Sequence, residues 1–353
     1  GTAGDVNGDG FSDIIVGAPI YENGQTDEGA AFIYLGSANG IQAIAATILE
    51  SNQAAANFGV SVATAADVNA DGFSDVIVGA NLYDATLTNQ GAAFGFLGSA
   101  SGLSSTASTT LLGNQAGGNT GIAVASAGDI NADGYFDVIV GSNKLSAGQT
   151  NEGGAVLYRG GPNGIVGFPA NDFQSNQSEA YFGSFVACAG DVNGDGYSDL
   201  LIGAPQYDNG SLDEGAVFVY LGSDPNASST PHAVIEGNQP FAEMGACASA
   251  GDVNGDGYSE IIVGAQGFDL GSTDEGAAFL CRGSALGILS IPSETFHSNQ
   301  AGAHFGRAVA SAGDVNGDGY SDIVIGANLF DNGQNDEGVA MVYHGDTEGI
   351  RNT

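Results

Sequence analysis

Five oxygen atoms at alternating positions of one short loop have the types and spacing of a metal-binding site. Asp191, Asn193, Asp195 and Asp199 supply side-chain oxygens at positions 1, 3, 5 and 9, and the backbone carbonyl of Tyr197 falls at position 7. Ca²⁺ takes roughly six to eight hard oxygen ligands, and the glycines of the loop allow the sharp turn that gathers them. The sequence therefore predicts a calcium-binding loop.

The same loop occurs six times, starting every 61 or 62 residues, at 5–13, 67–75, 129–137, 191–199, 252–260 and 314–322. The predicted metal ligands are Asp5, Asn7, Asp9, Phe11, Asp13, Asp67, Asn69, Asp71, Phe73, Asp75, Asp129, Asn131, Asp133, Tyr135, Asp137, Asp191, Asn193, Asp195, Tyr197, Asp199, Asp252, Asn254, Asp256, Tyr258, Glu260, Asp314, Asn316, Asp318, Tyr320 and Asp322, where Phe or Tyr contributes its carbonyl. Glu260 is one methylene longer than the Asp at position 9 of the other loops, so its carboxylate must approach the ion with a different side-chain conformation. We expect up to six Ca²⁺ ions.

The residues after each loop exclude a helical calcium motif. An EF-hand has a bidentate Glu at position 12 of its loop. Position 12 here is apolar, as in Val78, and lies inside a short β-branched run that ends at glycine. The loop therefore leads into a β-strand.

A period of about sixty residues with four short strands predicts a β-propeller. In the second repeat we expect strands at 57–66, 76–80, 91–98 and near 108–112. A four-stranded antiparallel blade cannot bury both faces alone, whereas blades packed side by side can. The predicted class is all-β, with residues 1–353 as a single β-propeller domain. A solenoid is the main rival, but its coils usually repeat at shorter periods.

The two end repeats differ from the others. The first lacks the segment that precedes its loop elsewhere, and the sixth ends before a fourth strand. We expect the closing strand to come from residues outside 1–353, with self-closure favoured over donation by a neighbouring molecule. Self-assembly by strand complementation stays open as the alternative.

The composition limits the kinds of binding partner and the cellular compartment that we expect. Five Lys and Arg residues against 41 Asp and Glu give a net charge of −36, which argues against nucleic acid or anionic lipid. No apolar run is long enough to span a membrane. Cys188, Cys247 and Cys281 are interpreted as free thiols in packed positions. Calcium loops favour an extracellular or cell-surface setting, where Ca²⁺ is abundant.

The motifs around the loops resemble a known family. Phenylalanine-glycine ahead of the loop and glycine-alanine-proline after it resemble the FG-GAP repeats of integrin α-subunit propellers, at Phe58-Gly59, Phe182-Gly183, Phe305-Gly306, Gly17-Ala18-Pro19 and Gly203-Ala204-Pro205. The resemblance implies calcium between the first two strands of a blade, with a structural role. It also implies adhesion or surface assembly through a protein or glycan ligand. The family typically has seven blades, so a seven-bladed parent stays open.

The third repeat departs most from this pattern. It has Thr120-Gly121 for phenylalanine-glycine and Gly141-Ser142 for glycine-alanine, and the family proline is missing. The second and third repeats also have Ala70 and Ala132 where the other loops have glycine.

No catalytic constellation is present in the sequence. The four histidines stand at no repeated position, and acid pairs such as Asp213-Glu214 precede the third strand in four repeats, which indicates a structural turn. We therefore expect a non-enzymatic interaction module. A propeller lectin and an accessory domain of a larger secreted enzyme remain the alternatives. Aromatic residues that recur after the second strand, such as Tyr83, fit a wedge between blades at least as well as a sugar platform.

Overall fold

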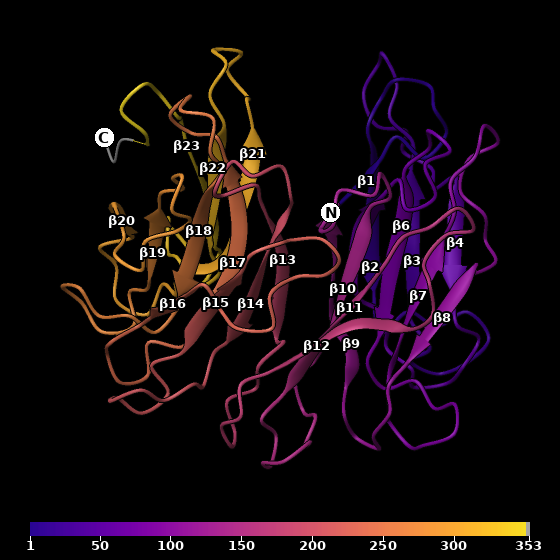
Figure 1. The fold of residues 1–353 in the computed structure, drawn as a ribbon, viewed down its shortest axis with the longest axis horizontal. Coiled ribbons are helices and arrows are strands. Elements are labelled where there is room, and N and C mark those ends of the chain that lie inside the picture. The colour runs from indigo at the N-terminus through magenta and orange to yellow at the C-terminus, as the bar shows by residue number, and fades with distance from the viewer. Residues whose placement is uncertain (351–353) are drawn as a thin grey trace. The chain divides into compact units, whose positions relative to one another are not determined.

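A computed structural model describes residues 1–350, and every regular element among them is a β-strand. The chain divides into two compact units, Gly1–Ser178 and Glu179–Thr353, and each is described by itself. Figure 1 shows the strands coloured along the chain. Each sheet is called a blade below and is numbered in chain order. The prediction of one domain over 1–353 stays a prediction, and residues 351–353 lie outside the described part.

The first unit contains three four-stranded blades. Blade 1 has β1 (Thr2–Gly4), β2 (Asp13–Ala18), β3 (Ala30–Tyr34) and β4 (Thr47–Glu50). Blade 2 has β5 (Phe58–Ala66), β6 (Asp75–Ala80), β7 (Ala92–Phe96) and β8 (Thr109–Leu112). Blade 3 has β9 (Thr120–Gly128), β10 (Asp137–Ser142), β11 (Gly154–Tyr158) and β12 (Pro169–Gln174).

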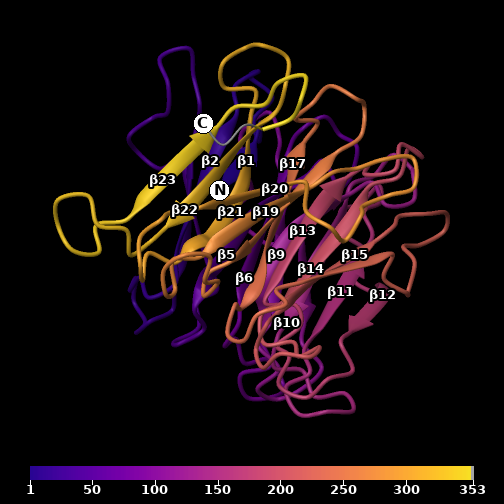
Figure 2. The same cartoon turned by 90° about the vertical axis from the view of Figure 1, so that its left-hand side faces the viewer.

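The second unit contains two four-stranded blades and one of three strands. Blade 4 has β13 (Phe185–Gly190), β14 (Asp199–Ala204), β15 (Ala216–Tyr220) and β16 (Ala233–Glu236). Blade 5 has β17 (Met244–Gly251), β18 (Glu260–Ala265), β19 (Ala277–Cys281) and β20 (Glu294–His297). Blade 6 has β21 (Phe305–Gly313), β22 (Asp322–Ala327) and β23 (Val339–Tyr343), which follow one another in Figure 2.

Strands in every blade pair antiparallel with their sequence neighbours, so each blade is a simple meander. The all-β class and the antiparallel blades expected of a β-propeller are confirmed. Blade 6 has three strands among the described residues, as expected for a repeat that ends before a fourth strand. The apolar run predicted at 76–80 is fully buried within β6, as a strand covered on both faces should be. Strand complementation stays a prediction.

Close backbone contact between neighbouring blades explains why the repeated glycines are needed. A Cβ on Gly17 would lie 2.0 Å from the carbonyl oxygen of Gly59 in the next blade, and a Cβ on Gly79 would lie 1.9 Å from that of Gly121. The glycine near the end of the second strand therefore faces the glycine at the phenylalanine-glycine position of the following blade, and any side chain would force the two blades apart. The same contact joins Gly203 to Gly245.

A bulge at the end of each first strand starts the loop. The register shifts between Thr64 and Ala66 in blade 2 and between Cys188 and Gly190 in blade 4. The last residue of that strand has positive φ, 79° at Gly190 and 58° at Ala66. Glycine favours this conformation, so a backbone requirement, beyond close packing, accounts for the recurring alanine-glycine pair.

All three thiols are free, as expected, but the expected burial holds for only one of them. Cys281 is buried, whereas Cys188 and Cys247 are partly buried.

Candidate calcium-binding loops

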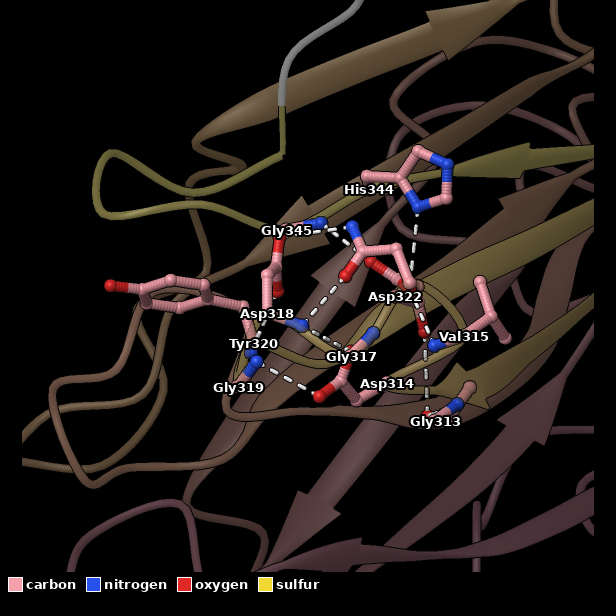
Figure 3. A network of polar contacts seen from close by, with 12 residues as sticks. Gly313, Asp314, Val315, Gly317, Asp318, Gly319, Tyr320, Asp322, His344 and Gly345 are labelled. Atoms are coloured by element: carbon pink, nitrogen blue, oxygen red, sulfur yellow. Dashed lines mark hydrogen bonds and ion pairs between the residues drawn. The ribbon is translucent and has the colours of Figure 1, made fainter.

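The carboxylate at position 1 organises the first half of each loop. Asp191 Oδ1 accepts hydrogen bonds from the backbone N–H groups of Gly194 (2.6 Å) and Asp195 (3.2 Å), and its Oδ2 accepts one from Gly196 (2.8 Å). Gly194 and Gly196 have φ of 73° and 89°, which turns successive N–H groups toward one point. Asp314 makes the same three bonds in the sixth loop, shown in Figure 3.

Positions 3 and 5 extend this network. Asn193 Oδ1 accepts the N–H of Asp195 (3.0 Å), and its Nδ2 donates to Asp195 Oδ2 (2.8 Å). Asp195 Oδ1 in turn accepts the N–H of Tyr197 (3.0 Å). In the fifth loop the Asn254 amide donates to Glu260 instead (3.4 Å), so the longer side chain does change the local arrangement.

The carboxylate at position 9 is buried in all six loops and joins two parts of its blade. Asp199 is fully buried; its Oδ2 accepts the N–H of Val192 (2.8 Å), and its Oδ1 accepts the N–H of Gly222 beyond β15 (2.8 Å). A Cβ on the corresponding Gly98 of blade 2 would lie 2.4 Å from the Ser74 carbonyl oxygen. Sequence reasoning missed this glycine, although its constant spacing of 23 residues from position 9 was a usable signal.

Burial and neighbouring acids disfavour the charged form of this carboxylate. Burial, with a smaller contribution from the negative charges of Asp71 and Asp67, raises the pKa of Asp75 to about 7 against the opposing effect of its N–H donors. The same causes raise the pKa of Asp137 to about 6, and the pKa of Asp199 and Glu260 to about 7.

The sixth loop differs in its electrostatics. Burial acts to raise the pKa of Asp322, but hydrogen bonds from Gly345, Val315 and His344 outweigh it, and the pKa lies below its ordinary value. Figure 3 shows His344, whose Nδ1 lies 3.3 Å from Asp322 Oδ2.

Loops of consecutive blades are also bonded to each other. The Ser74 N–H donates to the Asp5 carbonyl (2.9 Å), and the Ser259 N–H donates to that of Asp191 (3.0 Å). The ring at position 7 covers the glycine at position 4 of the preceding loop, because a Cβ on Gly194 would lie 2.8 Å from the Tyr258 ring. Within a unit, a change in one loop therefore acts directly on the next.

The predicted ligands lie together in single loops, but their carboxylates accept backbone N–H groups. Among residues 1–350, no three His, Cys, Asp or Glu side chains stand close enough to form a metal site by themselves. The donor set nevertheless fits a hard cation, since it consists of oxygens and includes a buried carboxylate with two acidic neighbours. Calcium binding and its ligands stay a prediction.

The acid pairs before the third strand have a structural explanation. Glu214 is buried, and its Oε1 accepts the Asn209 N–H of the preceding loop. Glu275 Oε1 likewise accepts the backbone N–H groups of Leu270 and Ser272. In blade 2 the acid is replaced by Gln90, whose amide oxygen accepts the Leu87 N–H (2.6 Å). A neutral amide that does the same work indicates a loop anchor.

Comparison with known protein families gives the repeats their identity. A model of the FG-GAP repeat matches residues 182–220, 245–281 and 305–343, and a model of the FG-GAP-like repeat matches residues 5–78. Together these segments make up more than half of the chain. The chain belongs to the FG-GAP repeat family. The third repeat, with Thr120 and Ser142, lies outside the matched segments.

Integrin alpha chains are similar to this FG-GAP repeat protein. Integrin alpha-5 of Xenopus laevis is 37% identical over 166 residues, covering 44% of this chain and 15% of the relative. Integrin alpha pat-2 of Caenorhabditis briggsae is 34% identical over 218 residues, covering 57% and 17%. Human integrin alpha-IIb is 35% identical over 162 residues, covering 44% and 15%. The chain thus matches less than a fifth of each of these relatives.

Proposed function

We propose that this FG-GAP protein is a calcium-stabilised extracellular interaction module without catalytic activity. The observation that carries the proposal is the six-fold repetition of a loop whose acids are held by backbone N–H groups around a buried carboxylate. Positions 1, 3, 5 and 9, with the carbonyl at position 7, would hold each ion. The bound cation would supply positive charge that favours the ionised form of these acids.

The likeness to integrin alpha chains supports adhesion or surface assembly as the role. A protein or glycan ligand on a cell surface or in the matrix fits a chain with 41 acids and five bases better than nucleic acid does. Among the described residues, no helix is long and apolar enough to cross a membrane. An extracellular setting follows from the calcium proposal, because weak loops need abundant Ca²⁺.

The alternative of a lectin built on repeated aromatic platforms is less well supported. The aromatic residue after the second strand packs edge-to-face on a ring of the third strand in four blades. The centroid distance is 5.2 Å for Tyr21–Phe32, Tyr83–Phe94, Tyr207–Phe218 and Phe268–Phe279. These rings already act as packing wedges.

The direct test compares thermal unfolding in about 2 mM Ca²⁺ with unfolding in excess EDTA, since extracellular modules have dissociation constants of about 0.1–1 mM. An ion that binds only the folded state adds about 2.7 kcal/mol to the free energy of unfolding when its free concentration is 100 times its Kd, and less at lower concentrations. We expect EDTA to lower Tm by at least about 5 °C, because 1 kcal/mol corresponds to about 2–4 °C in a domain of 150–250 residues.

Two variants make this test specific. Asp195→Ala removes one position-5 ligand and should lower Tm in Ca²⁺ by part of the EDTA effect. The control Asp208→Ala removes an acid of the β14–β15 loop outside the predicted sites and should leave the EDTA effect unchanged. Identical melting curves in Ca²⁺ and EDTA would show that the loops are ordinary turns and would refute the proposal.

A further inference from the structure

Blade 3 lacks the aromatic side chains that fill the boundary between blades 1 and 2. At that first boundary Phe58 packs on Phe94 (5.5 Å between centroids), and Tyr83 packs on Phe94 (5.2 Å). Sixty-two residues later the same positions hold Thr120, Val156 and Leu145. Each substitution is smaller than the ring it replaces, and the three positions face the same boundary.

The space left by these substitutions is a cavity of about 660 Å³ between β8 of blade 2 and β10–β12 of blade 3. Thr120, Leu145 and Val156 all line it, so the lost rings and the cavity coincide. The space is open to solvent, since Leu112 and Pro169 in its lining are exposed. A ligand that covers its apolar side chains would therefore gain binding energy from their burial.

At one other position of this boundary a side chain is missing, and a side chain from elsewhere in blade 3 fills the space. Gly95 stands where blade 1 has Ile33, and a Cβ on Gly95 would lie 2.8 Å from Cδ1 of Ile165. Ile165, from the β11–β12 connection, thus occupies the space of the missing side chain. No such replacement fills the cavity at Thr120, Leu145 and Val156.

The lining of the cavity is mixed, with polar side chains from both β8 and β12 beside apolar ones. Val140, Leu111 and Tyr158 are buried there, and the hydroxyls of Thr120 and Ser142 lie 2.7 Å apart. Ser142 replaces the alanine of the other blades, so two hydroxyls have been introduced where the pattern has apolar side chains. Small-molecule sites combine apolar walls with placed polar groups, and this lining offers both.

The charge of the lining selects against anions. No Lys, Arg or His lines the cavity, and Asp172 contributes a carboxylate at its exposed rim. Burial and the charge of Asp172 raise the pKa of Tyr158 to about 12, so its phenol stays neutral. A negatively charged ligand would meet repulsion here and an ammonium group would be attracted.

We propose that this cavity binds a small aromatic ligand that is neutral or positively charged. Its ring takes the place of the absent Phe and Tyr side chains, against Leu145 and Val156. Its polar substituents reach the Thr120–Ser142 hydroxyl pair or Asp172. This site is separate from the calcium loops and goes beyond the proposed role of the module.

The test uses tyramine as the probe, at constant Ca²⁺, with titration followed by calorimetry and by NMR of Leu and Val methyl groups. We expect saturable 1:1 binding, with shifts concentrated at Leu111, Leu145 and Val156. Two matched compounds separate the contributions: 3-(4-hydroxyphenyl)propionate has the same ring with an anionic group, and butylamine has the charge without a ring. Both should bind at least tenfold more weakly.

Two variants keep the proposal falsifiable. Thr120→Phe/Leu145→Tyr/Val156→Phe restores the residues of blade 2 and should abolish binding while the protein stays folded. Asp172→Asn changes one exposed side chain and should weaken tyramine several-fold while leaving neutral p-cresol unchanged; this variant decides the question if the triple variant does not fold. The proposal is overturned if tyramine shows no saturable binding at millimolar concentration. It is also overturned if the folded triple variant or Asp172→Asn binds tyramine as the wild type does, or if the shifts lie elsewhere.

Discussion

The boundary between blades 1 and 2 and the boundary between blades 2 and 3 share one backbone design and differ in what fills them. The glycine contact is the same in both, with the added Cβ 2.0 Å from Gly59 O in the first and 1.9 Å from Gly121 O in the second. The side chains differ, because Phe58 is completely buried against two rings whereas Thr120 lines a cavity. Backbone contacts and loops therefore hold the blades in register, and the filling can vary without changing that framework.

The largest expected difference between the two boundaries is in stability. Phe58→Ala should lower the free energy of unfolding by about 3–5 kcal/mol, because a buried ring is removed and a void remains. Thr120→Ala should cost only about 1 kcal/mol, through the lost hydrogen bond to Ser142. Urea unfolding in Ca²⁺ measures both. Equal losses would show that the second boundary is packed as tightly as the first.

The loop framework can be separated into structural and metal-binding parts by two variants of one loop. Asp75→Ala leaves two backbone N–H donors, those of Val68 and Gly98, without their acceptor and should cost at least about 2 kcal/mol even in EDTA. Asp71→Ala removes an exposed acid and should cost less than about 1 kcal/mol in EDTA, but more in Ca²⁺. If both variants lose stability only in Ca²⁺, position 9 has no structural role of its own.

A fall of stability with rising pH should appear when calcium is removed. The pKa values of Asp75, Asp199 and Glu260 are raised to about 7, above their ordinary values near 4. The folded state without metal therefore binds these protons more tightly than the unfolded state. That stabilisation is fully present below about pH 4 and is lost as the pH rises through 7.

Melting curves in EDTA between pH 5 and pH 8 should accordingly show a falling Tm, whereas saturating Ca²⁺ should remove the fall. The protein with Asp75→Asn, which has one fewer titrating group, should show a shallower slope in EDTA. The same slope with and without Ca²⁺ would contradict a cation beside these carboxylates.

The smallest expected change in stability concerns position 4 of the loops, where the second loop has alanine in place of glycine. Ala70 occupies position 4 with φ of 56°, where Gly8 and Gly194 occupy the same position with φ of 71° and 73°. Ala70→Gly should raise stability by about 0.5–1 kcal/mol, because glycine adopts this conformation without strain. Ala85→Gly, in an exposed loop at negative φ, is the matched control and should be neutral or slightly destabilising. Lower stability of Ala70→Gly would show that the alanine methyl makes a useful contact.

Sequence periodicity was enough to predict the blades and to place the loops. In the second repeat the predicted strands at 57–66 and 76–80 correspond to Phe58–Ala66 and Asp75–Ala80. This worked because each repeat places β-branched runs and glycines at the same distances, so local propensity and packing agree.

Contacts between distant parts of the chain were not predictable in the same way. The bond from Asp199 to Gly222 joins two turns of one blade, and the contact of Gly17 with Gly59 joins two blades. The 23-residue spacing of the first pair recurs in other blades, but spacing alone does not show that the two residues bond, and the second contact has no local signal. The divergence of Thr120 was visible in the sequence, but its meaning required the cavity that Leu145 and Val156 complete.

Native mass spectrometry directly counts the Ca²⁺ ions that the six loops are proposed to bind. After exchange into dilute Ca²⁺, we expect mass increments for six ions, or five if Glu260 weakens the fifth site. Asp195→Ala should lose one increment, whereas Asp208→Ala, outside the loops, should lose none. Two or fewer bound ions, or the same count in both variants, would refute calcium binding by the loops.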